Sequence, residues 1–156
     1  MSNRCPECGA TYHDETTCQD VYDAFLVLEF SDPAFGAVHF LTVACFMVQH
    51  GRYSDEGLRW IERQLRAHLE EQVPVEEIRR RAQREADQAR RSWKVTRQPD
   101  DPPPPNIAWS MTIADVAAGC LDEHGQPEAR RYRQLIHRWG TTTLKEMIDW
   151  DQRPGR

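Results

Sequence analysis

The stretch AFGAVHFLTVACFMVQHG, residues 34–51, decides the fold of this chain. It is apolar on nearly every face of a helix, so we predict a buried central helix over about residues 34–50. Gly51 is the expected C-cap, because glycine readily adopts the left-handed conformation that ends many helices. The apolar run contains His39 and Thr42 and is too short to cross a bilayer, so we interpret it as a core helix.

Helical periodicity continues on both sides of this central helix. A helix over about residues 19–30 precedes it and ends before Pro33, because proline disfavours the helical conformation of the preceding residue. No convincing strand pattern appears. Further helices are predicted over residues 54–69, 75–96, 112–120 and 128–150. We therefore predict an all-α fold, a helical bundle built on a helical hairpin.

The prolines divide the predicted bundle into segments of one domain. Residues 1–98 are expected to hold a zinc knuckle, the helical hairpin and a long basic helix. Residues 99–106 read as a proline-rich linker, stiff and extended. Residues 107–156 are expected to form C-terminal helices that pack back on the same core, because their apolar stripe would otherwise be exposed.

The N-terminus carries a metal-binding pattern. CPECG, residues 5–9, separates Cys5 from Cys8 by two residues on a tight turn, and Cys18 follows. This spacing lets both sulfurs reach one tetrahedral zinc at about 2.3 Å. Four protein ligands would make the site structural, whereas three ligands and an open position would permit chemistry. Zn²⁺ is therefore the expected cofactor, and the fourth ligand decides its role.

The geometry of the predicted hairpin ranks the candidates for the fourth ligand. A short loop near Pro33 makes the first two helices antiparallel and places Cys18 level with residue 48. His50 then lies within about one helical turn of Cys18, and we predict it as the ligand. Cys45, His13 and a water molecule stay open as alternatives. The predicted metal ligands are thus Cys5, Cys8, Cys18 and His50.

His39 belongs to the other end of the hairpin. It lies eleven residues before His50, about 16 Å along a helix, so the two cannot bind one ion. Its expected neighbour is Glu29 or Val27, and a Glu29–His39 hydrogen bond would satisfy two polar groups near the core. The alternative interpretation is a general acid/base pair. The sequence supplies no substrate site for such a pair, and the catalytic residues of any enzyme activity stay unknown.

The predicted basic helix favours a solvated surface over a nucleic-acid interface. Residues 76–97 hold eight basic side chains against four acidic ones. The spacing of Glu77 with Arg81, and of Glu76 with Arg80, allows ion pairs within the helix. A net charge of −5 also argues against a surface that binds nucleic acid throughout. Nucleic acid is therefore a less favoured partner.

Cysteine usage and the N-terminus suggest the compartment. The five cysteines are an odd number and three have metal spacing, so we expect no disulfide framework and a reducing cytoplasm. No apolar signal segment follows Met1, and no membrane association is expected.

The chain resembles a bacterial family of small proteins classed as a domain of unknown function. The resemblance rests on CPECG, on Cys18 just before a helix, and on VHFLTVACFMVQHG (residues 38–51), where the family shows His-x-Leu-Thr-Val and then Gln-His. A looser similarity joins MTIADVAAG (residues 111–119) with Arg138-Trp139. The resemblance implies metal binding through the cysteines and a histidine, and it supplies no activity.

The favoured function is a structural-zinc binding or adaptor module with a protein or small-molecule partner. One alternative is a metal-dependent enzyme that uses an open three-cysteine site or the Glu29–His39 pair. Another is a nucleic-acid-binding regulator. A monomer and a homodimer are expected about equally.

Overall fold

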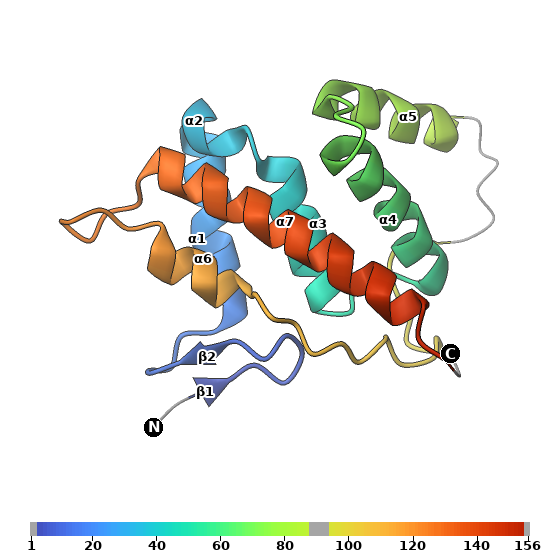
Figure 1. The fold of residues 1–156 in the computed structure, drawn as a ribbon, viewed down its shortest axis with the longest axis horizontal. Helices are drawn as coiled ribbons and strands as arrows, with labels where there is room; N and C mark the ends of the chain where they lie inside the picture. The colour runs from blue at the N-terminus through green and yellow to red at the C-terminus, as the bar shows by residue number, and fades with distance from the viewer. Residues whose placement is uncertain (1–2, 88–93, 155–156) are drawn as a thin grey trace. The chain divides into compact units, whose positions relative to one another are not determined.

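The structure is a computed structural model that describes residues 3–87 and 94–154 (Figure 1). The described residues are mostly helical, with one small antiparallel sheet. The elements in chain order are β1 (Asn3–Arg4), β2 (Thr11–Tyr12), α1 (Cys18–Ser31), α2 (Pro33–Gly36), α3 (His39–Gln49), α4 (Asp55–Leu69), α5 (Val75–Asp87), α6 (Ile113–Gly119) and α7 (Ala129–Asp151). The predicted helical fold is confirmed, and the two short strands correct its all-α description.

The chain forms two compact units. The first unit combines residues 1–50 with residues 107–156, and the second comprises residues 51–106. Both chain ends therefore belong to the first unit. The division of a single domain into residues 1–98, 99–106 and 107–156 stays a prediction.

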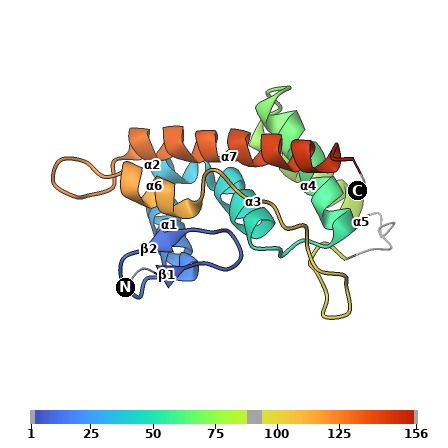
Figure 2. The same ribbon diagram turned by 60° about the horizontal axis from the view of Figure 1, so that its bottom comes forward.

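The first unit is built around α3 and α7. Helix α7 packs against α3, α6 and α2, and α1 packs against α2 and α6. Figures 1 and 2 show β1 and β2 at the N-terminal end of α1, with α6 between α1 and α7. The largest fully buried side chains of α7 are Trp139 and Tyr132, which lie on the predicted apolar stripe. The C-terminal helices thus share a core with the N-terminal ones.

Helices α1 and α3 form the predicted antiparallel hairpin. The ring of Tyr22 stacks on that of Phe46 with centroids 3.9 Å apart. Nearer the turn of the hairpin, His39 donates a hydrogen bond to Glu29. In each pair the two residues are equally far along the chain from residue 34, which is one residue from the predicted turn at Pro33. The register therefore brings Cys18 to the end of α3, as the sequence predicted.

The predicted continuous helix over residues 34–50 is wrong. Residues 37 and 38 form a turn that separates α2 from α3. Helix α2 approaches α1 so closely that a Cβ on Gly36 would lie 2.6 Å from the carbonyl oxygen of Glu29. This close approach of two backbones needs a change in chain direction before α3 begins. Gly51 has the predicted role, since its φ of +64° follows the end of α3.

The second unit contains α4 and α5. Ser54 caps α4 by accepting a hydrogen bond from the amide of Gly57 at 2.9 Å, as the sequence predicted. The predicted helix over residues 75–96 is described as helical only to residue 87, and residues 88–93 lie outside the described range. Its predicted end is wrong, because Thr96 instead forms an antiparallel bridge with Tyr53.

The predicted linker also belongs to this second unit. It opens with a turn in which the amide of Asp101 donates to the carbonyl of Gln98 at 3.0 Å, and the prolines 102–105 follow without regular structure. Among the described residues, no helix is long and apolar enough to cross a membrane.

Candidate metal centre

Four side chains of the first unit converge on one point. One ligand atom from each of Cys5, Cys8, Cys18 and His50 lies within 4.8 Å of the other three. The sulfurs of Cys8 and Cys18 are 3.6 Å apart. Two thiolates on a tetrahedral zinc at about 2.3 Å would be about 3.8 Å apart, so this spacing fits one shared ion. These four residues could hold a metal ion.

The turn between β1 and β2 positions the first two sulfurs. Asn3 pairs with Tyr12 in the strand register, and the amide of Cys5 donates to the carbonyl of Ala10 at 2.8 Å. Gly9 adopts a φ of +86°, which glycine reaches at no steric cost, and closes the turn by donating to the carbonyl of Cys5. The next amide, that of Ala10, then points at the sulfur of Cys8 at 3.4 Å.

Cys18 is fixed by the start of α1. Thr17 is the N-cap, with a capping box in which Thr17 and Asp20 exchange hydrogen bonds. Cys18 is therefore the first helical residue, and it is buried. The hydroxyl of Tyr12 donates to its sulfur at 3.1 Å, which links β2 to the cluster. No residue pattern indicates this role of Tyr12.

His50 is already oriented as a metal ligand. It is the C-cap of α3, and its Nδ1 donates to the carbonyl of Phe46 at 2.7 Å. That bond leaves the lone pair on Nε2, which is buried and makes no hydrogen bond in the part of the chain that the structure describes. The ring also stacks on Phe46, 4.2 Å between centroids. A buried acceptor without a partner is costly, and a metal ion would satisfy it.

The sulfur cluster favours one thiolate. A hydrogen bond from Cys8 lowers the pKa of Cys18 to about 4 against the opposing effect of burial, and the Tyr12 hydroxyl lowers it further. The same bond and burial raise the pKa of Cys8, which keeps its proton. The cluster can therefore stabilise negative sulfur, the form that binds metals.

The other candidates for the fourth ligand lie outside the cluster. His13 is exposed, in the loop after β2. Cys45 is fully buried on α3, and burial raises its pKa to about 12, as expected of a small apolar core residue. His39 lies at the start of α3, where its Nδ1 is 2.7 Å from a carboxylate oxygen of Glu29. The structure thus brings together the four predicted residues.

The predicted Glu29–His39 hydrogen bond forms, and two further donors join it. Thr42 donates to the second carboxylate oxygen of Glu29 at 2.5 Å, and the Tyr132 hydroxyl donates to the same oxygen. Tyr132 lies 103 residues further along the chain, on α7. The sequence indicated Tyr132 only as part of an apolar stripe, so its polar role was missed.

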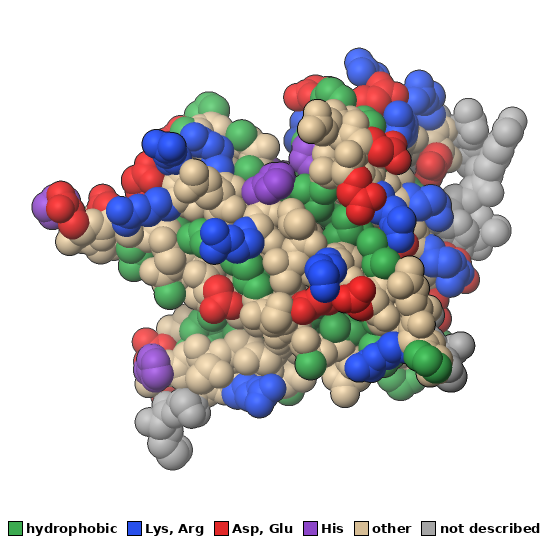
Figure 3. All heavy atoms as spheres, viewed as in Figure 1, with side chains coloured by type: hydrophobic (Ala, Val, Ile, Leu, Met, Phe, Trp, Pro, Cys, Tyr) green, Lys and Arg blue, Asp and Glu red, His purple; other side chains and the backbone are tan. Residues whose placement is uncertain are grey.

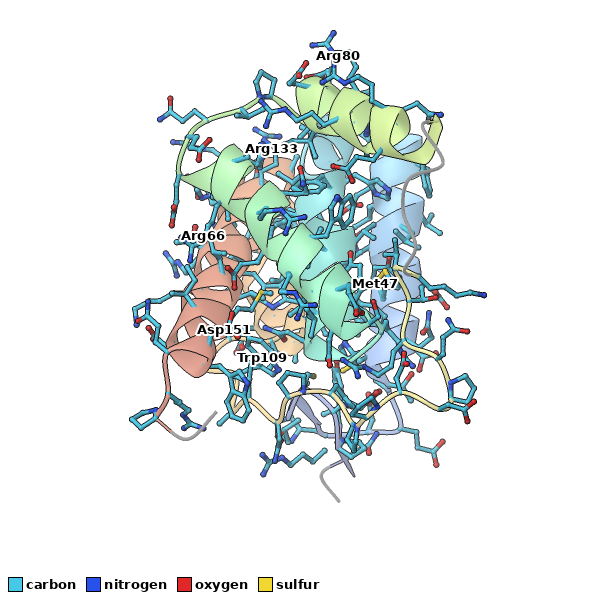
Figure 4. The ribbon with its side chains drawn as sticks, turned by 90° about the vertical axis from the view of Figure 1, so that its right-hand side faces the viewer. Met47, Arg66, Arg80, Trp109, Arg133 and Asp151 are labelled. Carbon is cyan, nitrogen blue, oxygen red and sulfur yellow. The ribbon has the colours of Figure 1, made fainter. Side chains whose placement is uncertain are left out.

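Three of the four arginines of α5 are engaged by one acidic side chain. Glu77 lies within 3.4 Å of Arg80, Arg81 and Arg84, and these ion pairs lower its pKa. The predicted pair of Glu77 with Arg81 is therefore confirmed, while Arg80 pairs with Glu77 instead of Glu76. Arg80 extends outward from α5 in Figure 4, and Figure 3 shows acidic and basic side chains mixed in that region.

The fold and the site define a mostly helical protein with a potential metal centre of three cysteines and a histidine. The chain belongs to a family of unknown function, DUF5946, whose profile matches residues 3–148. This match confirms the resemblance to a domain family of unknown function. The comparison with curated proteins finds no match, and neither does the comparison with solved structures.

Proposed function

We propose that this chain binds one structural Zn²⁺ through Cys5, Cys8, Cys18 and His50. The observation that carries the proposal is the buried, unpartnered Nε2 of His50 beside three sulfurs. Three thiolates and an imidazole are a known structural zinc set, and they leave no open position for a substrate. A closed site favours a structural role over the alternative of an open three-cysteine catalytic centre.

The ion would join the short β1–β2 turn to the hairpin of α1 and α3. The β1–β2 turn supplies Cys5 and Cys8, α1 supplies Cys18, and the end of α3 supplies His50. The strands have only two residues each, so they are too short to be stable alone. Zinc would therefore fix the N-terminal turn on the hairpin. We further propose that the unit so formed serves as a binding or adaptor module for a protein or small-molecule partner.

Metal analysis of the purified protein tests this proposal. The expected content is about one zinc per chain in the wild type, with loss of most of it in Cys5→Ser. His13→Ala is the matched control, since this exposed histidine was a rival ligand and should leave the zinc content unchanged. Folded wild-type protein that lacks zinc after a zinc-replete preparation would refute the proposal.

A further inference from the structure

A second group of polar side chains lies at the opposite end of the hairpin from the metal centre. Its middle is Glu29, whose side chain has no exposed surface. One carboxylate oxygen accepts from His39, and the other accepts from Thr42 and Tyr132. Two helices, α3 and α7, thus supply three hydrogen-bond donors to one buried carboxylate.

This arrangement fixes the imidazole of His39 in one tautomer. The carboxylate accepts this hydrogen bond, so Nδ1 of His39 carries a proton, and in the neutral imidazole Nε2 holds the lone pair. The His39 side chain is 28% exposed, in contrast to Glu29. A buried carboxylate that orients a solvent-accessible imidazole is the pairing that makes histidine an effective general base.

An exposed apolar side chain lies beside this imidazole. The ring of Phe30 is 5.1 Å from that of His39, centroid to centroid, and Phe30 is 75% exposed. Val27, one turn earlier on α1, is 64% exposed. Large apolar side chains at this level of exposure are rare among the described residues, and one of them, Phe30, lies beside the oriented histidine. Phe30 offers an apolar acyl or aryl group a surface to cover.

We propose that His39 is the general base of a hydrolytic site for apolar esters, with Glu29 as its positioning residue. Nε2 takes a proton from water while the water oxygen forms a bond to the acyl carbon. The ester C–O bond then breaks, and the departing alkoxide takes the proton from the imidazolium. The products are a carboxylic acid and an alcohol, and His39 returns to its starting state. This site is separate from the proposed zinc and does not depend on it.

Hydrolysis of 4-nitrophenyl butyrate by the full-length protein tests the proposal. His39→Gln should lower kcat by about a hundredfold, the lower range for a positioned general base. Glu29→Gln should lower kcat with KM unchanged, because the carboxylate does not touch the ester. Phe30→Ala should raise KM with kcat largely retained. His137→Gln, which removes an exposed histidine of α7, is the matched control and should hydrolyse the ester at the wild-type rate.

A measurement on the unmodified wild type covers the case in which Glu29→Gln does not fold. Diethyl pyrocarbonate acylates unprotonated imidazole, and peptide mapping reports its rate at each histidine. His39 should react several times faster than the exposed His13 and His137. Wild-type hydrolysis in His39→Gln, or equal acylation of the three histidines, would overturn the assignment.

Discussion

At the scale of single residues, the two histidines of α3 show how one side chain type takes two roles. Both use Nδ1 as a donor, His50 to the carbonyl of Phe46 and His39 to the carboxylate of Glu29. They differ in what surrounds Nε2. In His50 this nitrogen is buried near three sulfurs, whereas the ring of His39 is partly exposed beside Phe30.

Substituting each histidine should therefore have a different consequence. His50→Ala should lose most of the bound metal, because the fourth ligand is gone. His39→Ala should keep the metal and lose about 1–3 kcal/mol in the free energy of unfolding, because Glu29 stays buried with one donor fewer. Metal content and urea unfolding measured on both variants check this. Metal loss in His39→Ala with retention in His50→Ala would contradict the assigned ligands.

Tyr132 should contribute to stability through its hydroxyl. Tyr132→Phe keeps the ring but removes a donor to the buried carboxylate of Glu29, at a cost of about 1–3 kcal/mol in the free energy of unfolding. Tyr22→Phe is the matched control, since its ring still stacks on Phe46. Chemical denaturation measures the free energy of unfolding of the two variants. Equal values would show that the hydroxyl of Tyr132 is dispensable.

At the scale of secondary structure, the close approach of α2 to α1 makes Gly36 a critical position. A methyl group there would lie 2.6 Å from the backbone oxygen of Glu29. A backbone oxygen cannot move away by a side-chain rotation, so the helices themselves would have to shift. Gly36→Ala should therefore lower the free energy of unfolding by about 1–3 kcal/mol.

Gly119→Ala provides the comparison for this prediction. Its added methyl would meet Cδ1 of Leu135 at 2.8 Å, and that flexible side chain can move. The greater helix propensity of alanine, by about 1 kcal/mol, should offset part of the cost. Thermal unfolding should rank Gly36→Ala well below Gly119→Ala, and the reverse order would argue against tight contact between α1 and α2.

The hairpin and its register could be predicted because helical geometry is regular. A turn near Pro33 and a rise of about 1.5 Å per residue are enough to bring His50 to Cys18 and His39 to Glu29. The break at residues 37 and 38 could not be predicted, because an apolar run without periodicity gives no signal for a change of direction. The strands β1 and β2 are likewise too short for an alternating pattern.

The clustering of the four candidate ligands could be predicted from the sequence, whereas their supporting contacts could not. The cysteine spacing and the hairpin register together selected the three sulfurs and His50. The hydrogen bond from the Tyr12 hydroxyl to the sulfur of Cys18 depends on the path of β2, and no residue pattern predicts that path. Tyr132 reaches Glu29 from α7, and such long-range pairs depend on tertiary packing.

At the scale of the whole molecule, the proposed metal centre lies entirely in the first unit. All four ligands fall within residues 1–50, whereas α4 and α5 belong to the second unit. Removing zinc with a chelator should accelerate amide hydrogen exchange in residues 3–18, because metal binding and local folding are coupled. Exchange in α4 should not change. Mass spectrometry of exchanged peptides checks this, and an equal acceleration in α4 would show that the metal stabilises both units.

Zinc K-edge X-ray absorption on the purified full-length protein tests the metal centre most directly. It reports the ligand atoms and their distances to the ion without relying on substitutions that could unfold the chain. The proposed zinc site predicts three sulfurs at about 2.3 Å and one nitrogen at about 2.0 Å, in a four-coordinate geometry. An oxygen in place of the nitrogen, or fewer than three sulfurs, would contradict the closed site of Cys5, Cys8, Cys18 and His50.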